Sequence, residues 1–315
     1  MPSNCHDRYE EARVPGHEPV LLHETLNILA PHDGGLYLDC TFGGGGHSKA
    51  ILNSADCKLQ AIDRDPAAAE RAKDFAKDFP ERFAFLGDTF SKLDELKTTG
   101  YAGILMDLGV SSFQLDEGDR GFSFRADGPL DMRMNPDKGM GAAELIAKSS
   151  LPELEKILKE YGEEPRFRKL AREMKEWSQQ GLLTGTLALA NLIEKSLGRN
   201  PRSKIHPATL AFQGLRIAVN DELGEIERAL PKAFERLEKG GILAVISFHS
   251  LEDRIVKQFF KKMAGRPEHR FDKSFVQDRV KLATIMTTKP VVATDEESRR
   301  NPRSRSAKLR AIKKD

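Results

Sequence analysis

Short apolar runs alternate with helix-like stretches through the first third of the chain. The runs predict strands at Leu36–Asp39, Leu59–Ile62, Phe83–Leu86 and Gly103–Met106. Within Pro66–Phe79, alanine and phenylalanine recur at helical spacing after a proline that suits the first turn. This alternation is typical of a parallel sheet covered by helices, so we expect a doubly wound α/β fold.

Helical periodicity then replaces the strand pattern for about a hundred residues. Ser150-Leu-Pro-Glu153 matches a capping box, and the apolar-faced stretches Glu164–Gln179 and Thr186–Leu197 that follow it each stop near a glycine. A fourth helix begins near Pro207, and we expect it to kink or break at Pro231.

The strand pattern returns only at Ile242–Ile246, and a helix over Leu251–Met263 follows it. The simplest topology is a sheet domain that is interrupted by a helical insertion. We therefore predict a core made of residues 1–118 and 220–315, and an all-helical insertion of residues 119–219.

The composition fits one large or two modest globular domains, because 39% of the 315 residues are hydrophobic and 31% are charged. The apolar runs are too short to span a membrane, and the first residues lack the pattern of a signal or transit peptide. We expect a cytoplasmic protein without a membrane partner. Cys5, Cys40 and Cys57 have no CxxC spacing, so we expect neither a disulfide framework nor a metal site.

The net charge of +2 conceals an uneven distribution of basic residues. Residues 299–315 contain eight lysines and arginines and one acid, so this tail carries +7 and the rest of the chain carries −5. A basic tail on an acidic body is typical of a protein that contacts phosphates. A solvated, disordered terminus explains the same composition equally well, and the sequence leaves both open.

The segment Asp39–His47 predicts a strand that runs through four glycines into a helix. Glycines at such a turn let the backbone approach a ligand and expose amide groups at the helix start. The dinucleotide fingerprint G-x-G-x-x-G is absent, since its last position falls on Ser48 or Lys49, and the lysine of a phosphate-binding P-loop is also missing. These departures disfavour a dinucleotide enzyme and an ATPase.

Three acids, Asp39, Asp63 and Asp107, each end a predicted strand. The carboxyl ends of parallel strands meet at one edge of a sheet, where Asp63 stands at the position that binds the hydroxyls of a ribose. Each acid alone could instead cap the next helix. Together with the glycine loop they predict an adenosine-type pocket, and an acid after the fourth strand favours S-adenosylmethionine, which carries a cationic amino group.

Seven sequence blocks occur in one order along the chain: Asp39-Cys-Thr-Phe-Gly-Gly-Gly-Gly-His47-Ser48, Ala61-Ile-Asp63-Arg-Asp65-Pro66, Asp107-Leu-Gly-Val-Ser-Ser112, Arg120-Gly-Phe-Ser-Phe124, Asp127-Gly-Pro-Leu-Asp-Met-Arg-Met134, Ser247-Phe-His-Ser-Leu-Glu-Asp-Arg254 and Asn301-Pro-Arg-Ser-Arg-Ser306. In this order they resemble a bacterial family of small-subunit ribosomal RNA methyltransferases, the methyltransferase H or MraW family. The resemblance spans His17 to Arg310. It implies a Rossmann-like class I methyltransferase core with a helical insertion for substrate recognition.

The resemblance also implies transfer of a methyl group from S-adenosylmethionine to N4 of one cytidine in the decoding region of 16S ribosomal RNA. The cofactor contacts that it implies are Gly45, Gly46, His47, Asp63, Phe90, Asp107 and Gln114. An aromatic ring such as Phe90 suits an adenine face, and a carboxamide such as Gln114 offers both a donor and an acceptor to the amino-acid end. Ordinary core packing is the alternative for Phe90.

The catalytic group is less clear from the sequence. The N4 amine is a poor nucleophile, so the reaction needs in-line positioning and a hydrogen-bond acceptor more than a strong base. Many amino-methyltransferases place Asp/Asn/Ser-Pro-Pro-aromatic after the fourth strand, whereas this chain has Asp107-Leu-Gly-Val110. The candidates are a backbone carbonyl of Leu108–Val110 and the side chains of Ser247 and His249. His249 is equally suited to capping the helix that begins near Leu251.

Aromatic and basic residues that could stack on a base or contact phosphates gather in a predicted loop and in the tail. The substrate-binding candidates are Arg120, Phe122, Phe124, Asp131, Arg133, Arg216, Asn220, Arg303 and Arg305. The alternative is a loop that pins the insertion to the core.

We expect as partner the small-subunit ribosomal RNA or the 30S subunit, and a homodimer stays open. The alternative functions are a small-molecule methyltransferase and a non-catalytic RNA-binding assembly factor.

Overall fold

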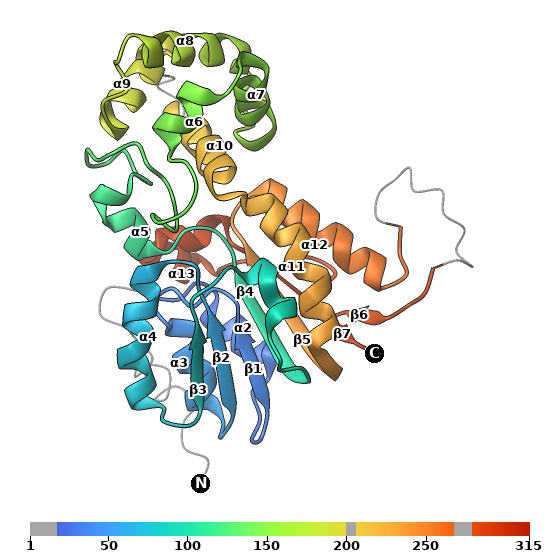
Figure 1. Cartoon of the computed structure of the whole chain (residues 1–315). Coiled ribbons are helices and arrows are strands. Elements are labelled where there is room, and N and C mark those ends of the chain that lie inside the picture. The colour runs from blue at the N-terminus through green and yellow to red at the C-terminus, as the bar shows by residue number, and fades with distance from the viewer. Residues whose placement is uncertain (1–17, 200–205, 268–278) are drawn as a thin grey trace. The chain divides into compact units, whose positions relative to one another are not determined.

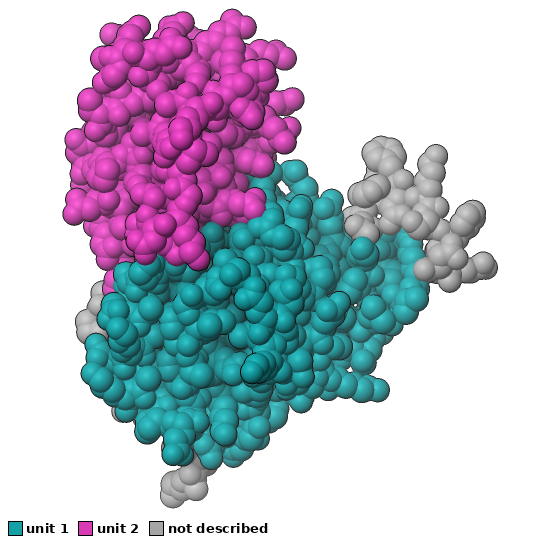
Figure 2. All heavy atoms as spheres, in the orientation of Figure 1, with its two compact units in different colours: residues 1–109, 223–315 teal, residues 110–222 magenta. Residues whose placement is uncertain are grey.

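A computed structural model describes residues 18–199, 206–267 and 279–315 of the chain (Figure 1). Cys5 and His17 lie outside the described residues. The chain divides into two compact units, residues 1–109 with 223–315 and residues 110–222, which Figure 2 colours separately. We call them the sheet unit and the helical unit. The insertion limits expected from the sequence, 119 and 219, fall inside those of the helical unit.

The sheet unit is built on a seven-stranded sheet with the order β3-β2-β1-β4-β5-β7-β6. Strands β1 to β5 run parallel, and β7 is antiparallel to both β5 and β6. The strands are β1 (Leu36–Asp39), β2 (Lys58–Ile62), β3 (Phe83–Leu86), β4 (Tyr101–Asp107), β5 (Leu237–Ser247), β6 (Ala283–Ile285) and β7 (Lys308–Lys314). The expected doubly wound α/β fold is confirmed.

Side chains of the central strands enter two cores, one on each face of the sheet. In β4, Leu105 belongs to one core, while Ile104 and Met106 belong to the other, as the two-residue period of a strand requires. Helices α2, α3 and α4 cover the first face, and α11 and α12 cover the second. The helical segments of this unit are α2 (Leu22–Leu29), α3 (Gly46–Ser54), α4 (Pro66–Asp78), η1 (Phe90–Glu95), α11 (Glu222–Arg236), α12 (Ser250–Met263), α13 (Asp295–Arg300) and η5 (Pro302–Ser306).

The basic C-terminal segment is not a solvated tail. It forms α13, η5 and then β7, which pairs with β5 from Ile242↔Lys313 to Ser247↔Lys308. The guanidinium of Arg310 is buried and bonds to both carboxylate oxygens of Asp253 at 2.6 and 3.1 Å. Of the two alternatives left open by the sequence, the solvated, disordered terminus is wrong, because apolar residues between the cations complete the sheet.

The helical unit encloses its own apolar core. Its segments are α5 (Ser112–Asp116), η2 (Gly118–Arg120), α6 (Ala142–Lys148), α7 (Leu151–Lys156), η3 (Ile157–Tyr161), α8 (Phe167–Gln179), α9 (Thr186–Leu197) and α10 (Ala208–Asn220). The predicted capping box is present at the start of α7, where Ser150 Oγ accepts from Glu153 N and the Glu153 carboxylate accepts from Ser150 N.

Of the kink or break expected at Pro231, the break is wrong. The break lies at Asp221, which adopts a left-handed φ of 49° after α10, and Pro231 lies inside the continuous helix α11. Pro231 and Glu227, whose carbonyl loses its intrahelical donor, are both exposed, so water can satisfy that carbonyl. The opposite face of α11 buries Ala229, Leu230 and Ala233 and holds the helix together.

None of the helices in the described part of the chain is long and apolar enough to cross a membrane.

Candidate functional site

The candidate site lies where β1, β2 and β4 end. The strand order reverses at β1, which has β2 on one side and β4 on the other, and ligands of open α/β sheets bind at such a switch point. The loop after β1 joins the three strand ends. Thr41 Oγ1 accepts from Asp107 N at 2.7 Å, and Gly43 N donates to Asp63 Oδ2 at 2.8 Å.

Asp39 holds this loop in place through hydrogen bonds. Its buried carboxylate accepts from Ser48 Oγ at 2.7 Å and from Thr41 N at 3.0 Å. Burial raises the pKa of Asp39, and these hydrogen bonds oppose the rise. Both oxygens are thus engaged within the fold, which gives Asp39 a structural task.

Asp63 keeps capacity for a ligand. Its carboxylate accepts from Gly43 N at 2.8 Å and from Asp65 N at 2.9 Å, and burial raises its pKa. A carboxylate offers about four lone-pair positions, so two backbone donors leave room for two further donors. The hydroxyls of a ribose would fit that need.

Asp107 and His47 form the polar end of the site. His47 is buried, its Nε2 lies 3.0 Å from the carbonyl oxygen of Val20, and burial lowers its pKa to about 4. The ring is therefore neutral at pH 7, with Nε2–H donating to Val20. Its other nitrogen, Nδ1, presents a lone pair toward Asp107 Oδ2, which lies 3.7 Å away.

Asp107 has an incomplete set of partners. Within the described residues no hydrogen-bond donor reaches its buried Oδ1. Burial, together with the nearby charges of Asp39 and Glu252, raises the pKa of Asp107 to about 8, while the charge of Arg303 lowers it. The Asp107 side chain is 24% exposed, so Oδ2 stays reachable while the buried Oδ1 has no donor among the described residues. A buried polar atom without a donor is costly, so this position suits a cation or another donor that the described residues do not supply.

The glycines of the loop are required by packing. Gly45 has a φ of 76°, and a Cβ there would lie 2.8 Å from the ring of Phe42. A Cβ on Gly46 would lie 2.4 Å from Pro19 Cγ. Helix α3 begins at Gly46 without a side-chain cap, so the amide groups of its first turn stay available to a ligand.

Phe90 and Gln114 already have local roles. The Phe90 ring is 9% exposed and belongs to the core, with the Arg64 guanidinium 5.8 Å from its centre. Gln114 lies in the helical unit, where its buried carboxamide accepts from Ser111 N at 3.0 Å in the capping box of α5.

The catalytic candidates lie at the ends of β4 and β5. The Leu108 side chain is buried and its N–H donates to the Ile246 carbonyl at 2.9 Å. Ser247 Oγ donates to the Lys308 carbonyl at 3.4 Å. At the start of α12, Glu252 caps the helix by accepting from the N–H groups of Phe248 and His249 at 2.7 and 3.2 Å.

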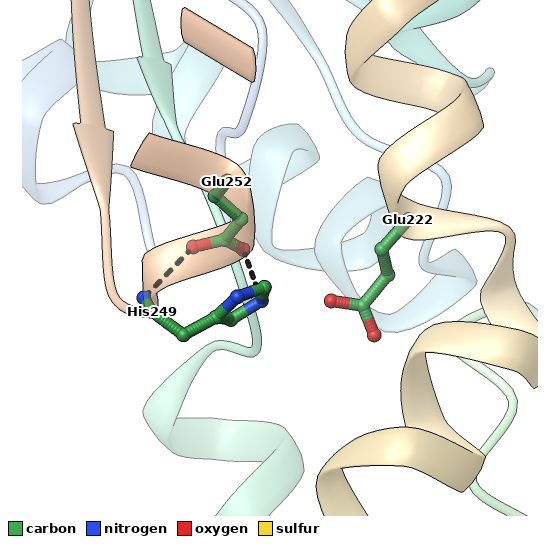
Figure 3. Close-up of side chains that lie close together, drawn as sticks. All are labelled: Glu222, His249 and Glu252. Carbon is green, nitrogen blue, oxygen red and sulfur yellow. Dashed lines mark hydrogen bonds and ion pairs between the residues drawn. The ribbon is translucent and has the colours of Figure 1, made fainter. Parts of the chain in front are cut away.

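His249 itself lies against that cap. Its Nε2 is 3.2 Å from Glu252 Oε1 (Figure 3). The capping carboxylate therefore comes from Glu252, and neither ring nitrogen of His249 has a hydrogen-bond partner among the described residues. Glu222, also drawn in Figure 3, bonds within the helical unit to Arg216.

The substrate candidates of the helical unit have internal partners. Arg133 forms an ion pair with Asp131, with contacts of 2.6 to 3.1 Å, and Arg216 forms one with Glu222 at 2.8 and 2.9 Å. Arg120 donates to the carbonyls of Arg133 and Met134 at 3.3 and 2.8 Å.

The other three candidates of this unit are packed or buried. Asn220 accepts from Met134 N and donates to the Met132 carbonyl, both at 2.7 Å. Phe122 is buried, and Phe124 packs on Phe212 with 4.8 Å between ring centres. These contacts hold the loop 120–134 within its own unit.

A model of the MraW methylase family matches residues 15–315. The chain belongs to this family. The ribosomal RNA small subunit methyltransferase H of Gluconobacter oxydans is 50% identical over 301 residues, which cover 94% of this chain and 93% of that protein. The protein of the same name from Rickettsia felis is 46% identical over 307 residues, covering 95% and 98%. Among solved structures, an rRNA methylase from Streptococcus thermophilus covers 95% of this chain and 99% of its own, with 11% identity and a TM-score of 0.43.

Membership in the MraW methylase family makes the chain a methyltransferase with S-adenosylmethionine as cofactor. The residues present fit that molecule. Asp63 has acceptor capacity left for hydroxyls, and Asp107 Oδ1 has no donor from the described residues, where a cationic amino group would serve.

Two features of this MraW methylase site carry no sequence signal. Pro19 and Val20 contact Gly46 and His47 from a segment 27 residues earlier. Arg303, which the sequence offered only as a phosphate contact, lies close enough to Asp107 to influence its charge. Both features arise from contacts between segments that are far apart in the chain.

Proposed function

We propose that this MraW methylase transfers a methyl group from S-adenosylmethionine to N4 of a cytidine in the decoding region of small-subunit ribosomal RNA. The observation that carries the proposal is Asp107 at the switch point, a partly exposed carboxyl group whose pKa is raised to about 8 and whose buried Oδ1 has no donor among the described residues. The names of the relatives at 46% and 50% identity support the RNA substrate.

The cofactor contacts follow the polarity of the site. Asp63 binds the ribose hydroxyls, Asp107 binds the amino group of the methionine end, and Gly45, Gly46 and His47 line the loop beside it. Phe90 offers the adenine an edge of its mostly buried ring. Gln114 is proposed for the amino-acid end, although its carboxamide oxygen already serves the α5 cap.

The chain needs little acid–base chemistry for this reaction. The bound cofactor supplies an electrophilic methyl group on a sulfonium. The protein holds the N4 amine in line and offers it an acceptor, for which we propose the Leu108 carbonyl, Ser247 Oγ or His249. The Ser247 hydroxyl donates its hydrogen bond to the Lys308 carbonyl, so its oxygen lone pairs stay available to an N–H donor.

For the RNA we propose contacts from the helical unit and from the C-terminal segment. Arg120, Phe122, Phe124, Asp131, Arg133, Arg216 and Asn220 shape the helical unit's loop, and their internal contacts support a rigid surface more than free phosphate-binding side chains. Arg305 is exposed, and its Nε donates to the Ser298 carbonyl at 3.1 Å, which leaves the outer part of its guanidinium in solvent and supports a phosphate contact. Arg303 lies close enough to Asp107 for its charge to lower the pKa of that carboxyl group.

The decisive experiment is methyl transfer from labelled S-adenosylmethionine to 30S subunits from cells that lack this protein. Mass spectrometry then maps the modified nucleotide. A single new N4-methylcytidine, absent with the Asp63→Ala variant, is expected. Label in another nucleotide would refute the site, and cofactor binding without RNA labelling would favour a small-molecule substrate. No cofactor binding would favour a non-catalytic assembly factor. A parallel assay with naked 16S RNA shows whether the substrate is the free RNA or the subunit. The mass of the protein in solution shows whether it is a monomer or a homodimer.

A further inference from the structure

The segment Glu297–Asn301 bonds to residues Glu18–Leu21, which we call the N-terminal strap. Arg300 forms a two-point ion pair with Glu18, with contacts of 2.7 and 2.5 Å. Asn301 Nδ2 donates to the Glu18 carbonyl at 3.0 Å, and Glu297 Oε1 accepts from Leu21 N at 2.8 Å. All these residues belong to the sheet unit.

The strap in turn contacts the cofactor loop at two points. The Val20 carbonyl accepts from His47 Nε2 at 3.0 Å, which fixes the tautomer and leaves Nδ1 facing Asp107. Pro19 lies so close to the start of α3 that a Cβ on Gly46 would come within 2.4 Å of its ring. Moving the strap would therefore move the His47 ring and the first turn of α3.

The strap also contains a backbone conformation that needs external support. Leu21 is fully buried and has a left-handed φ of 53°, which is unfavourable for a branched side chain. Its N–H is satisfied by Glu297, a buried carboxylate whose pKa is raised by burial and by the charges of Glu24 and Glu18. Glu297 therefore anchors the backbone of the strap at Leu21.

We propose that Glu297 and Asn301 are positioning residues of the cofactor site, which act through the strap to hold His47 and the start of α3 in place for the methionine end of the cofactor. The identity of that ligand rests on the proposed function. The inference gives the Asn301-Pro-Arg-Ser-Arg-Ser306 block a role at the cofactor site, apart from any contact with RNA.

Four variants distinguish the loss of a strap contact from a general loss of stability. Glu297→Ala removes the acceptor for Leu21 N–H, whereas Glu297→Gln keeps an oxygen there. Asn301→Asp keeps the oxygen that accepts from Arg303 N at 3.3 Å but loses the donor to Glu18. Ile312→Val is the matched control, since Ile312 is fully buried in β7 and makes no strap contact. It lowers the melting temperature by about 1 to 4 °C.

The measurement is calorimetric binding of S-adenosylmethionine and of 5′-methylthioadenosine, which lacks the amino-acid end, to the full-length chain. We expect Glu297→Ala and Asn301→Asp to weaken binding of the former about tenfold and of the latter less than about twofold. Glu297→Gln should restore wild-type binding of both, and Ile312→Val should leave both unchanged.

Equal losses for both ligands, or wild-type binding of S-adenosylmethionine in Asn301→Asp, would overturn the positioning role. If Glu297→Ala does not fold, Asn301→Asp carries the test alone. A wild-type chain that binds neither ligand refutes the proposed function itself, and that result is distinct from unchanged variants of a binding-competent chain.

Discussion

The sheet unit and the helical unit each contain a cluster of acids beside basic or aromatic side chains, but the pKa values of these acids are shifted in opposite directions. In the sheet unit, Asp107 has a pKa raised to about 8 by burial and lacks a donor at Oδ1 among the described residues. In the helical unit, partial burial raises the pKa of Asp131, yet the hydrogen bonds from Arg133 bring it below the ordinary value.

The difference shows that residue type alone does not mark a binding site. Asp131 and Arg133 satisfy each other, as do Arg216 and Glu222, so these groups stabilise a surface. The incompletely paired Asp107 carboxyl group lowers the stability of the ligand-free protein. Such groups are typical of binding sites, where a ligand supplies the missing partner. The following predictions test this contrast, beginning with the largest effect.

Replacing Asp107 by Asn should weaken S-adenosylmethionine binding by about a hundredfold, because a desolvated ion pair is lost. The same change should stabilise the ligand-free protein at pH 8. The folded-state pKa is raised to about 8, so the stability that the protonated group contributes is present below pH 4 and is lost as pH rises through 8. Calorimetric titration and thermal unfolding check both effects. A variant that binds normally or melts lower at pH 8 would contradict this view of Asp107.

The affinity for S-adenosylmethionine should rise between pH 6 and 7.5, by at most about tenfold per pH unit. Binding a cation requires Asp107 to lose its proton, and its pKa is about 8. His47, with a pKa of about 4, does not titrate in this range. Titrations in buffers of different ionisation enthalpy measure the released proton. Asp107→Asn is the control, and a profile as steep as the wild type's in that variant would assign the proton elsewhere.

Asn220→Ala should destabilise the helical unit by about 1–3 kcal/mol, because it leaves Met134 N–H and the Met132 carbonyl without their buried partner. Hydrogen exchange at Met134 should accelerate, whereas the cofactor affinity should stay unchanged. Glu160→Ala, at an exposed position of η3, is the control and should change stability by less than about 0.5 kcal/mol. A loss of cofactor affinity with intact stability would show that Asn220 belongs to the site.

Arg305→Ala should have the smallest effect, a decrease of about one in the slope of log affinity against log salt for RNA binding. Its guanidinium is exposed, so its removal leaves the fold intact. Lys97→Ala is the control and should leave the slope unchanged. Lys97 is exposed and precedes β4, at the amino ends of the parallel strands. Equal slopes for wild type and Arg305→Ala would remove Arg305 from the interface. Deleting residues 299–315 is unsuitable for this purpose because it removes β7.

Local pattern predicted a large part of this molecule. Strands β1 and β3 have the predicted bounds, and β2 and β4 extend theirs by one to two residues, because apolar runs between turn residues specify a buried strand. The Ser150 capping box and the glycine that follows α9 also depend only on near neighbours. The acids at the strand ends were predictable because parallel strands bring their carboxyl ends to one edge.

Contacts between distant segments decided the rest. The cations of β7 hide its strand character, and only its pairing with β5 and the bond from Arg310 to Asp253 make it part of the sheet. Asp131 has its arginine partner two residues away in the chain, whereas the state of Asp107, with a buried Oδ1 that lacks a donor among the described residues, depends on the packing of distant segments. The sequence by itself determined where chain segments form strands and which acids end them. The tertiary structure decided which of those acids remains unsatisfied, because burial and the positions of donors, which set a pKa, depend on residues far apart in the chain.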